Sequence, residues 1–196
     1  MPLRPARAAL CAAAVAAAAL AAPAHAAHVA LPGDGTWLEF DVDSLAAPSF
    51  GTGWIDDTDG SALSFDFTVA AGRQAVLTVV DAGFAGDTFT VTNDGALLGQ
   101  TSSVAAGTTD GDVVVDFDAA LADARYSRGT WTLGAGRYAI GGALLQSVTL
   151  DGAPLAATSG GIRLQLSAVP EPAVAAMLLA GLGLAGFAAR RRNDNA

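Results

Sequence analysis

The chain of 196 residues contains no lysine, one cysteine and two histidines, and these absences exclude much of the chemistry by which enzymes act. The cysteine, Cys11, lies in an N-terminal segment that we expect to be removed. The mature protein would then hold no disulfide, no thiolate nucleophile and no cysteine metal ligand. A zinc site usually draws on several His or Cys residues, and this chain has too few of them.

The middle of the chain is acidic, and its few cations are all arginine. Residues 27–169 contain 17 Asp and Glu against five Arg, which gives a net charge of −12. Such a surface repels a phosphate backbone, so we expect no nucleic-acid partner. The same charge keeps the domain soluble and discourages its adhesion to anionic lipid.

Residues suited to catalysis are scarce in the same segment. Its only histidine is His28, which would lie two residues into the mature chain, where a free end gives a Ser-His-Asp triad no rigid support. Its only glutamate is Glu39. A glycan hydrolase that uses two Asp as acid and base is an alternative, but the spacing of the 16 Asp selects no pair. We therefore predict a protein without enzymatic activity.

The first 26 residues have the three parts of a secretory signal peptide. Two arginines give a positive start, and residues 8–22 form a short apolar run that is nearly all alanine. Ala24 and Ala26 then form the small-x-small pattern that a signal peptidase accepts. We predict export by the general secretion machinery and cleavage after Ala26, so that residues 27–169 form the exported domain.

The exported domain has the pattern of short strands. Apolar and polar side chains alternate with a period of two, which is typical of a sheet with one buried face. Asn93, Asp94 and Gly95 tolerate positive φ and predict a tight hairpin. One helical turn is predicted at residues 119–124, with Asp118 as its cap. Roughly nine strands predict an all-β fold, an antiparallel β-sandwich or jelly roll. The predicted strands are residues 37–42, 63–69, 75–80, 88–92, 96–100, 113–117, 130–133, 138–145, 147–150 and 162–167.

Calcium is the one cofactor that the sequence invites. Asp56, Asp57 and Asp59 crowd three carboxylates on a predicted loop, and residues 110–112 supply two more. Hard cations favour clusters of oxygen ligands, although this loop lacks the spacing and the closing Glu of an EF-hand. The alternative is a solvated acidic turn, because Asp and Gly are common turn formers.

Three tryptophans raise the hypothesis of carbohydrate binding, because exposed aromatic rings stack on sugars. Trp54 follows two glycines in a predicted loop and is the candidate for contact with a sugar. Core packing is the alternative for each tryptophan. Trp131 alternates with polar threonines, which favours a core position.

The C-terminal region has a distinct composition. Pro170, Glu171 and Pro172 end the last predicted strand, and residues 173–189 carry no charge. Seventeen residues at about 1.5 Å each would form a helix near the lower limit for crossing a bilayer. Three arginines follow directly: Arg190, Arg191 and Arg192. We predict a single transmembrane helix at residues 173–189, with the arginines in the cytoplasm and the domain outside the inner membrane.

This order of Pro-Glu-Pro, short apolar helix and arginine cluster over residues 170–196 resembles the PEP-CTERM sorting signal. The resemblance implies a Gram-negative, exopolysaccharide-producing host. It also implies recognition by an exosortase, a membrane-embedded enzyme resembling cysteine transpeptidases, with cleavage near Pro-Glu-Pro. The protein would be anchored in the inner membrane for a time and would then reach the cell surface or the extracellular space.

Residues 77–91, with the later segments 93–95 and 130–136, more loosely resemble an ectodomain often found ahead of such tails, and no activity follows from that likeness. The sequence as a whole predicts a non-enzymatic protein of the surface or extracellular matrix, associated with exopolysaccharide in a biofilm. A carbohydrate-binding module of the cell surface is the first alternative, and the hydrolase with paired Asp is the second.

Overall fold

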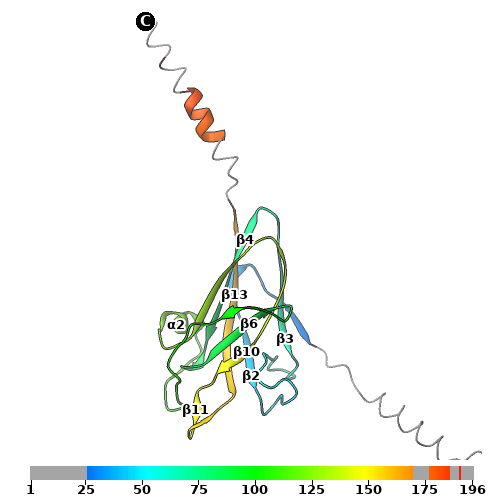
Figure 1. The fold of residues 1–196 in the computed structure, drawn as a ribbon, viewed down its shortest axis with the longest axis vertical. Helices are drawn as coiled ribbons and strands as arrows, with labels where there is room; N and C mark the ends of the chain where they lie inside the picture. Colours follow the sequence, from blue (N-terminus) through cyan, green and yellow to red (C-terminus); the bar gives the residue numbers. More distant parts are fainter. Residues whose placement is uncertain (1–25, 170–176, 186–189, 191–196) are drawn as a thin grey trace, which may run out of the picture.

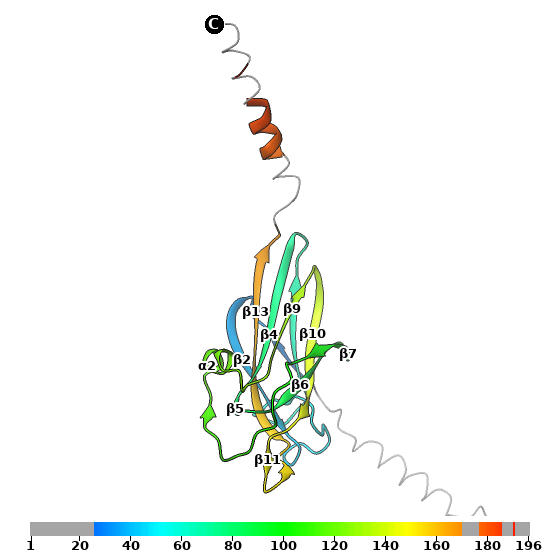
Figure 2. The same cartoon turned by 60° about the vertical axis from the view of Figure 1, so that its left-hand side comes forward.

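The alternating side chains build two β-sheets that stack face to face, as the computed structural model shows in Figures 1 and 2. The structure describes residues 26–169, 177–185 and 190. The first sheet has the order β1-β3-β10-β6-β7, formed by Ala27–Ala30, Leu63–Val69, Gly136–Gln146, Thr88–Asn93 and Ala96–Gln100. The second sheet has the order β2-β13-β4-β9, formed by Asp34–Asp43, Ala157–Ala168, Arg73–Asp81 and Arg128–Leu133.

Smaller elements complete the domain. Two short ribbons pair β5 with β8 and β11 with β12, and one helix, α2, spans Phe117–Ala122. The ribbon strands are Gly83–Phe84, Val113–Val114, Thr149–Leu150 and Ala153–Pro154. All described strand pairs are antiparallel except β1 with β3. The described part of the chain is thus mostly β, as predicted.

The core lies between the two sheets. Strands of both sheets contribute large buried side chains to it, including Phe40, Phe65 and Phe89. Burial of one such side chain contributes roughly 1.5–3 kcal/mol. In the second sheet β13 lies between β2 and β4, and its Ile162 and Leu164 are fully buried. An inner strand of the second sheet is therefore the last described strand in the sequence.

The structure corrects the prediction for residues 113–124. Only Val113–Val114 forms a strand, and Phe117 already begins the helix. The helix cap is Asp116, not Asp118, because the carboxylate of Asp116 accepts hydrogen bonds from the backbone N–H groups of Asp118 and Ala119. The apolar run of three valines suggested a longer strand, but this local cap stops it.

The predicted hairpin after β6 is confirmed. Asp94 has φ 48° and Gly95 has φ 77°, so both turn residues adopt the left-handed conformation that a tight two-residue hairpin requires. The turn joins Asn93 to Ala96, which are partners in the β6–β7 ladder.

The predicted targeting segments lie mostly outside the described residues. These segments include Ala24, Pro170, Glu171, Pro172, Arg191 and Arg192. Ala26 is exposed directly before β1, and Arg190 is exposed in helical conformation. Residues 177–185, within the predicted span, are helical. No helix of the described residues is both long enough and apolar enough to cross a membrane.

Candidate functional site

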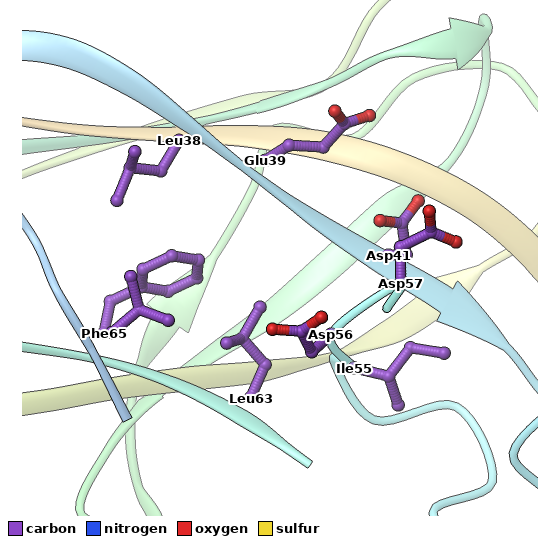
Figure 3. A pocket seen from close by; sticks show the side chains of 9 residues that line it. Leu38, Glu39, Asp41, Ile55, Asp56, Asp57, Leu63 and Phe65 are labelled. Carbon is purple, nitrogen blue, oxygen red and sulfur yellow. The ribbon is translucent and has the colours of Figure 1, made fainter. Parts of the chain in front are cut away.

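A pocket of about 330 Å³ opens beside β2, the edge strand of the second sheet. Figure 3 shows apolar side chains on one side of this pocket and carboxylates on the other. We call it the acidic pocket. Its lining residues are Val29, Leu38, Glu39, Asp41, Ile55, Asp56, Asp57, Leu63 and Phe65. The mixture of a hydrophobic wall with a cluster of negative charge suits a cationic group better than an anionic one.

Two backbone hydrogen bonds between separate segments of the chain bring the carboxylates together. The N–H of Ile55 donates to the carbonyl of Asp41 at 2.8 Å, and the N–H of Asp41 donates to the carbonyl of Ile55 at 3.2 Å. This bridge places Asp56 and Asp57 beside the β2 edge. Sequence reasoning assigned Asp56 and Asp57 to a loop and did not connect them with Glu39 or Asp41, because the pairing joins segments that no local pattern relates.

The crowding perturbs Asp41. Burial raises the pKa of Asp41 to about 6, and the negative charges of Glu39, Asp57 and Asp56 add to the effect in that order. Near neutral pH the carboxylate of Asp41 is therefore ionised at a cost in free energy. A cation in the acidic pocket would lower that cost.

The predicted calcium ligands Asp56, Asp57 and Asp59 line one hollow, but they do not form a group that could hold a metal ion. The carboxylate of Asp56 accepts from the N–H of Thr58 at 2.8 Å, and that of Asp59 accepts from the N–H of Ser61 at 2.9 Å. Each therefore closes its own turn, which matches the acidic-turn alternative. Within the described residues no group of three or more His, Cys, Asp or Glu side chains could hold a metal ion.

The predicted sugar contact at Trp54 is wrong. The residue is only 2% exposed and stacks on Phe40, with ring centroids 3.9 Å apart. Gly142 makes room for it, because a Cβ at that position would lie 2.5 Å from the indole. Trp54 therefore packs in the core and does not present its ring to solvent. Trp131 is half-buried against the same core.

A surface constellation near β1 has the residue types of a catalytic triad but not its geometry. Ser64 Oγ lies 2.9 Å from His28 Nδ1, and Asp66 Oδ2 lies 3.0 Å from the same nitrogen. A working triad uses the two different ring nitrogens for the hydroxyl and the carboxylate. The arrangement therefore does not support nucleophilic catalysis, although sequence reasoning missed that these three residues meet.

Two aspartates are fully buried, one at the end of β4 and one directly before β6. Asp81 Oδ2 accepts from the N–H groups of Gly86 and Asp87, both at 3.2 Å. Asp87 Oδ1 accepts from the N–H of Val148 at 2.6 Å. We call Asp81 and Asp87 the buried pair. Burial raises the pKa of Asp81 to about 8, with the charge of Asp87 as the next cause, and burial also raises the pKa of Asp87.

The buried pair holds a connection in place and faces no solvent. One oxygen of each carboxylate, Asp81 Oδ1 and Asp87 Oδ2, is buried without a hydrogen-bond partner. Sequence reasoning singled out neither residue. The available signal was the position of Asp81 directly after a continuous apolar run, where the burial of that run extends to the next side chain.

The folded domain reaches almost to the Pro-Glu-Pro tripeptide. Ala168, the last residue of β13, pairs with Arg73 of β4. The N–H of Val169 then donates to the carbonyl of Gly72 at 2.9 Å. Only Pro170 onward lies beyond this ladder, so a cut near Pro-Glu-Pro falls next to the domain and not within it.

One comparison with known proteins identifies the C-terminal region of the chain. The family model of the PEP-CTERM protein-sorting motif matches residues 168–192. The crystal structure of the pre-peptidase C-terminal domain of a Bacillus anthracis collagenase is similar at 9% identity and a TM-score of 0.37, over 74% of this chain and 98% of that one. No curated protein matches the chain. The chain therefore carries a PEP-CTERM protein-sorting motif at residues 168–192, and this motif supports an exported protein that is targeted to an exosortase.

Proposed function

We propose that this chain is a non-enzymatic protein of the cell surface or extracellular matrix, cut by an exosortase near Pro-Glu-Pro and associated with exopolysaccharide. The observation that carries the proposal is the position of the sorting motif, which begins at Ala168, the last residue of β13. The motif thus follows directly on a closed β-sandwich. The domain is the part that reaches its destination, and the C-terminal region is the sorting signal that directs it there.

Cleavage at this position leaves the domain intact. The ladder of β13 with β4 ends at Ala168, and the ladder of β13 with β2 ends earlier, at Gln165. A cut after Pro170 or Glu171 therefore breaks no described strand pairing. The released domain keeps its core and its stability, which a matrix protein needs outside the cell.

The described side chains favour a binding or structural role over catalysis. Ser64, His28 and Asp66 lack triad geometry, and the buried pair has no access to a substrate. Among the described residues, the lining of the acidic pocket includes no Ser, His, Cys or Lys, and no group of acids or histidines could hold a metal ion. The net charge of −12 over residues 27–169 also limits the choice of polysaccharide. A neutral or cationic polymer fits this surface, whereas an anionic one is repelled.

Mass spectrometry of the protein from its native host tests the processing step. In cells with the exosortase, we expect a chain that begins at Ala27 and ends near Pro-Glu-Pro. In cells without the enzyme, the C-terminus should extend to Ala196. A chain that ends at Ala196 in both strains would refute the proposal.

A matched pair of variants sharpens this test. Glu171→Gln removes the acid of the tripeptide and should abolish processing, whereas Asp194→Asn removes an acid beyond the matched motif and should leave processing unchanged. Equal processing of both variants would show that the tripeptide does not direct the cut. Retention of the processed domain on purified host exopolysaccharide tests the second half of the proposal.

A further inference from the structure

Two of the five arginines of residues 27–169 lie together at one end of this acidic domain. Two turns carry the same tripeptide, Ala-Gly-Arg, which ends at Arg73 in the β3–β4 turn and at Arg137 in the β9–β10 turn. Both arginines are exposed. Figures 1 and 2 show the two turns side by side, at the end where β13 leaves the domain. We call residues 70–73 and 134–137 the arginine end.

Strand register explains why these turns meet. Val69 pairs with Gly136, and Ala75 pairs with Leu133, so both turns cross between the sheets at the same level. Arg73 is also the ladder partner of Ala168, the first residue matched by the sorting motif. The arginine end therefore surrounds the point where the chain continues into the tail.

Neither arginine is neutralised by a neighbouring acid in the ion pairs of residues 26–169, which join other residues. Two acids, Asp66 and Asp94, line a hollow with Arg137. Asp66 already contacts His28 at 3.0 Å, and neither acid forms an ion pair with Arg137. The remaining exposed residues of the arginine end are alanines and glycines. This surface offers charge without a large apolar side chain to insert.

Five aspartates gather at the opposite end of β13, whereas the exposed Asp34 pairs with Gln165 nearer the arginine end. A second hollow there is lined by Ala157, Thr158 and Ser159 together with five aspartates: Asp41, Asp43, Asp56, Asp57 and Asp59. The 12 residues of β13 separate the two ends by about 40 Å at roughly 3.3 Å each. This distance is several times the Debye length of about 8 Å at physiological ionic strength. Charges at one end therefore act nearly independently of charges at the other.

We propose that the arginine end rests on the anionic phospholipid headgroups of the membrane that holds the tail before cleavage. The inference relies on the proposed membrane-held tail. Three residues, Pro170 to Pro172, separate Val169 from the apolar run, and an extended chain of three residues spans at most about 10 Å. The arginine end is thereby kept within about one Debye length of the headgroups, where each arginine is attracted. The acidic end, about 40 Å farther out, is screened from them.

This orientation would serve the sorting reaction. With the arginine end on the membrane, β13 points its C-terminal end at the bilayer and presents Pro-Glu-Pro at the surface where a membrane-embedded enzyme works. The reverse orientation, with the opposite end of β13 on the membrane, would instead bring five aspartates to the anionic surface.

A solvatochromic dye near the membrane tests the proposal. The chain that still carries residues 170–196 is reconstituted in vesicles of phosphatidylcholine with or without phosphatidylglycerol. Where the signal peptide is retained, the chain also carries Cys11→Ala. The dye is attached at Ala135→Cys in the arginine end or at Ala153→Cys in β12, at the other end of the domain. We expect a blue shift at Ala135→Cys only in the anionic vesicles and only at low salt. No shift is expected at Ala153→Cys.

Charge variants provide the controls. Arg73→Gln should lower the ratio of docked to undocked chains about fivefold, and Arg73→Gln with Arg137→Gln about 25-fold. Arg125→Gln removes an equal charge from an exposed residue that pairs with Asp123, away from the arginine end, and should have no such effect. A shift that is equal in both vesicle types, or one that survives the double variant, would overturn the proposal.

The sorting enzyme gives a separate result. If the double variant loses processing in cells but leaves the vesicle signal unchanged, the arginine end contacts the enzyme and the lipid proposal fails. If vesicle docking follows the expected pattern while the chain is not processed, the proposed sorting fails and the lipid contact stands. The vesicle experiment needs no exosortase, so the two failures are distinguishable.

Discussion

The buried pair and the acidic pocket place the same chemical group in opposite settings. Asp81 and Asp87 are fully buried, and each accepts hydrogen bonds from backbone N–H groups. The pocket carboxylates of Asp41 and Asp57 lie at a sheet edge, where water and a cation can reach them. Burial is the largest cause of the raised pKa of Asp41 as well as of Asp81. A raised pKa therefore belongs to a buried structural carboxyl group in the buried pair and to a carboxyl group open to solvent in the acidic pocket.

The largest expected effect comes from removing an anchor. Asp81→Ala leaves the N–H groups of Gly86 and Asp87 buried without an acceptor, which should lower the free energy of unfolding by about 3 kcal/mol or more. Urea denaturation measures this loss. Asp57→Ala, at an exposed residue of the pocket, should change stability by less than about 0.5 kcal/mol. Similar losses in the two variants would erase the contrast between the regions.

The second effect is a fall in stability as the pH rises. Asp81 has a pKa of about 8 in the folded chain against an ordinary 3.8, so the folded state holds the extra proton between these values. Its contribution is fully present below about pH 4 and is lost as the pH rises through about 8. The melting temperature should therefore decrease from pH 5 to pH 8, as differential scanning calorimetry would show.

A variant separates the two regions in that pH experiment. Asp41 acts in the same direction, but only up to its pKa of about 6. Asp81→Asn should therefore flatten the slope between pH 6 and pH 8. It should reduce but not abolish the slope between about pH 4 and pH 6, where Asp41 still contributes. An unchanged slope above pH 6 in Asp81→Asn would show that Asp81 is already ionised in the folded protein.

The smallest expected effect comes from relieving the crowding in the acidic pocket. Asp41→Asn removes one of several adjacent negative charges and should stabilise the domain by about 0.5 kcal/mol at pH 8 and low salt. The gain should shrink at high salt because the pocket is open to solvent. Asp112→Asn, at an exposed acid outside the acidic pocket, is the control and should show a smaller gain. A loss of stability in Asp41→Asn would mean that its carboxylate makes a favourable contact.

Much of the fold could be predicted because strand alternation and turn chemistry are local. Residues 63–69 form a strand with the predicted bounds, and the turn at Asp94 and Gly95 has the predicted backbone. The strand predicted at 162–167 extends back to Ala157, because its early residues include Gly160 and Gly161, which carry no side chain to show an alternation. The acidic pocket was predicted only in part, since Asp41 and Asp57 meet through a pairing between distant segments.

The order of β domain and sorting motif was determined by the sequence alone, because both rest on composition and short-range pattern, and the signal peptide ahead of them stays a prediction. Tertiary structure alone decided which side chains are buried and which segments meet. Trp54 is buried because Gly142, far along the chain, leaves space for it. Arg73 and Arg137 share one end because the register of β3, β4, β9 and β10 aligns two separate turns. Burial and proximity depend on long-range packing, which no local pattern in the chain encodes.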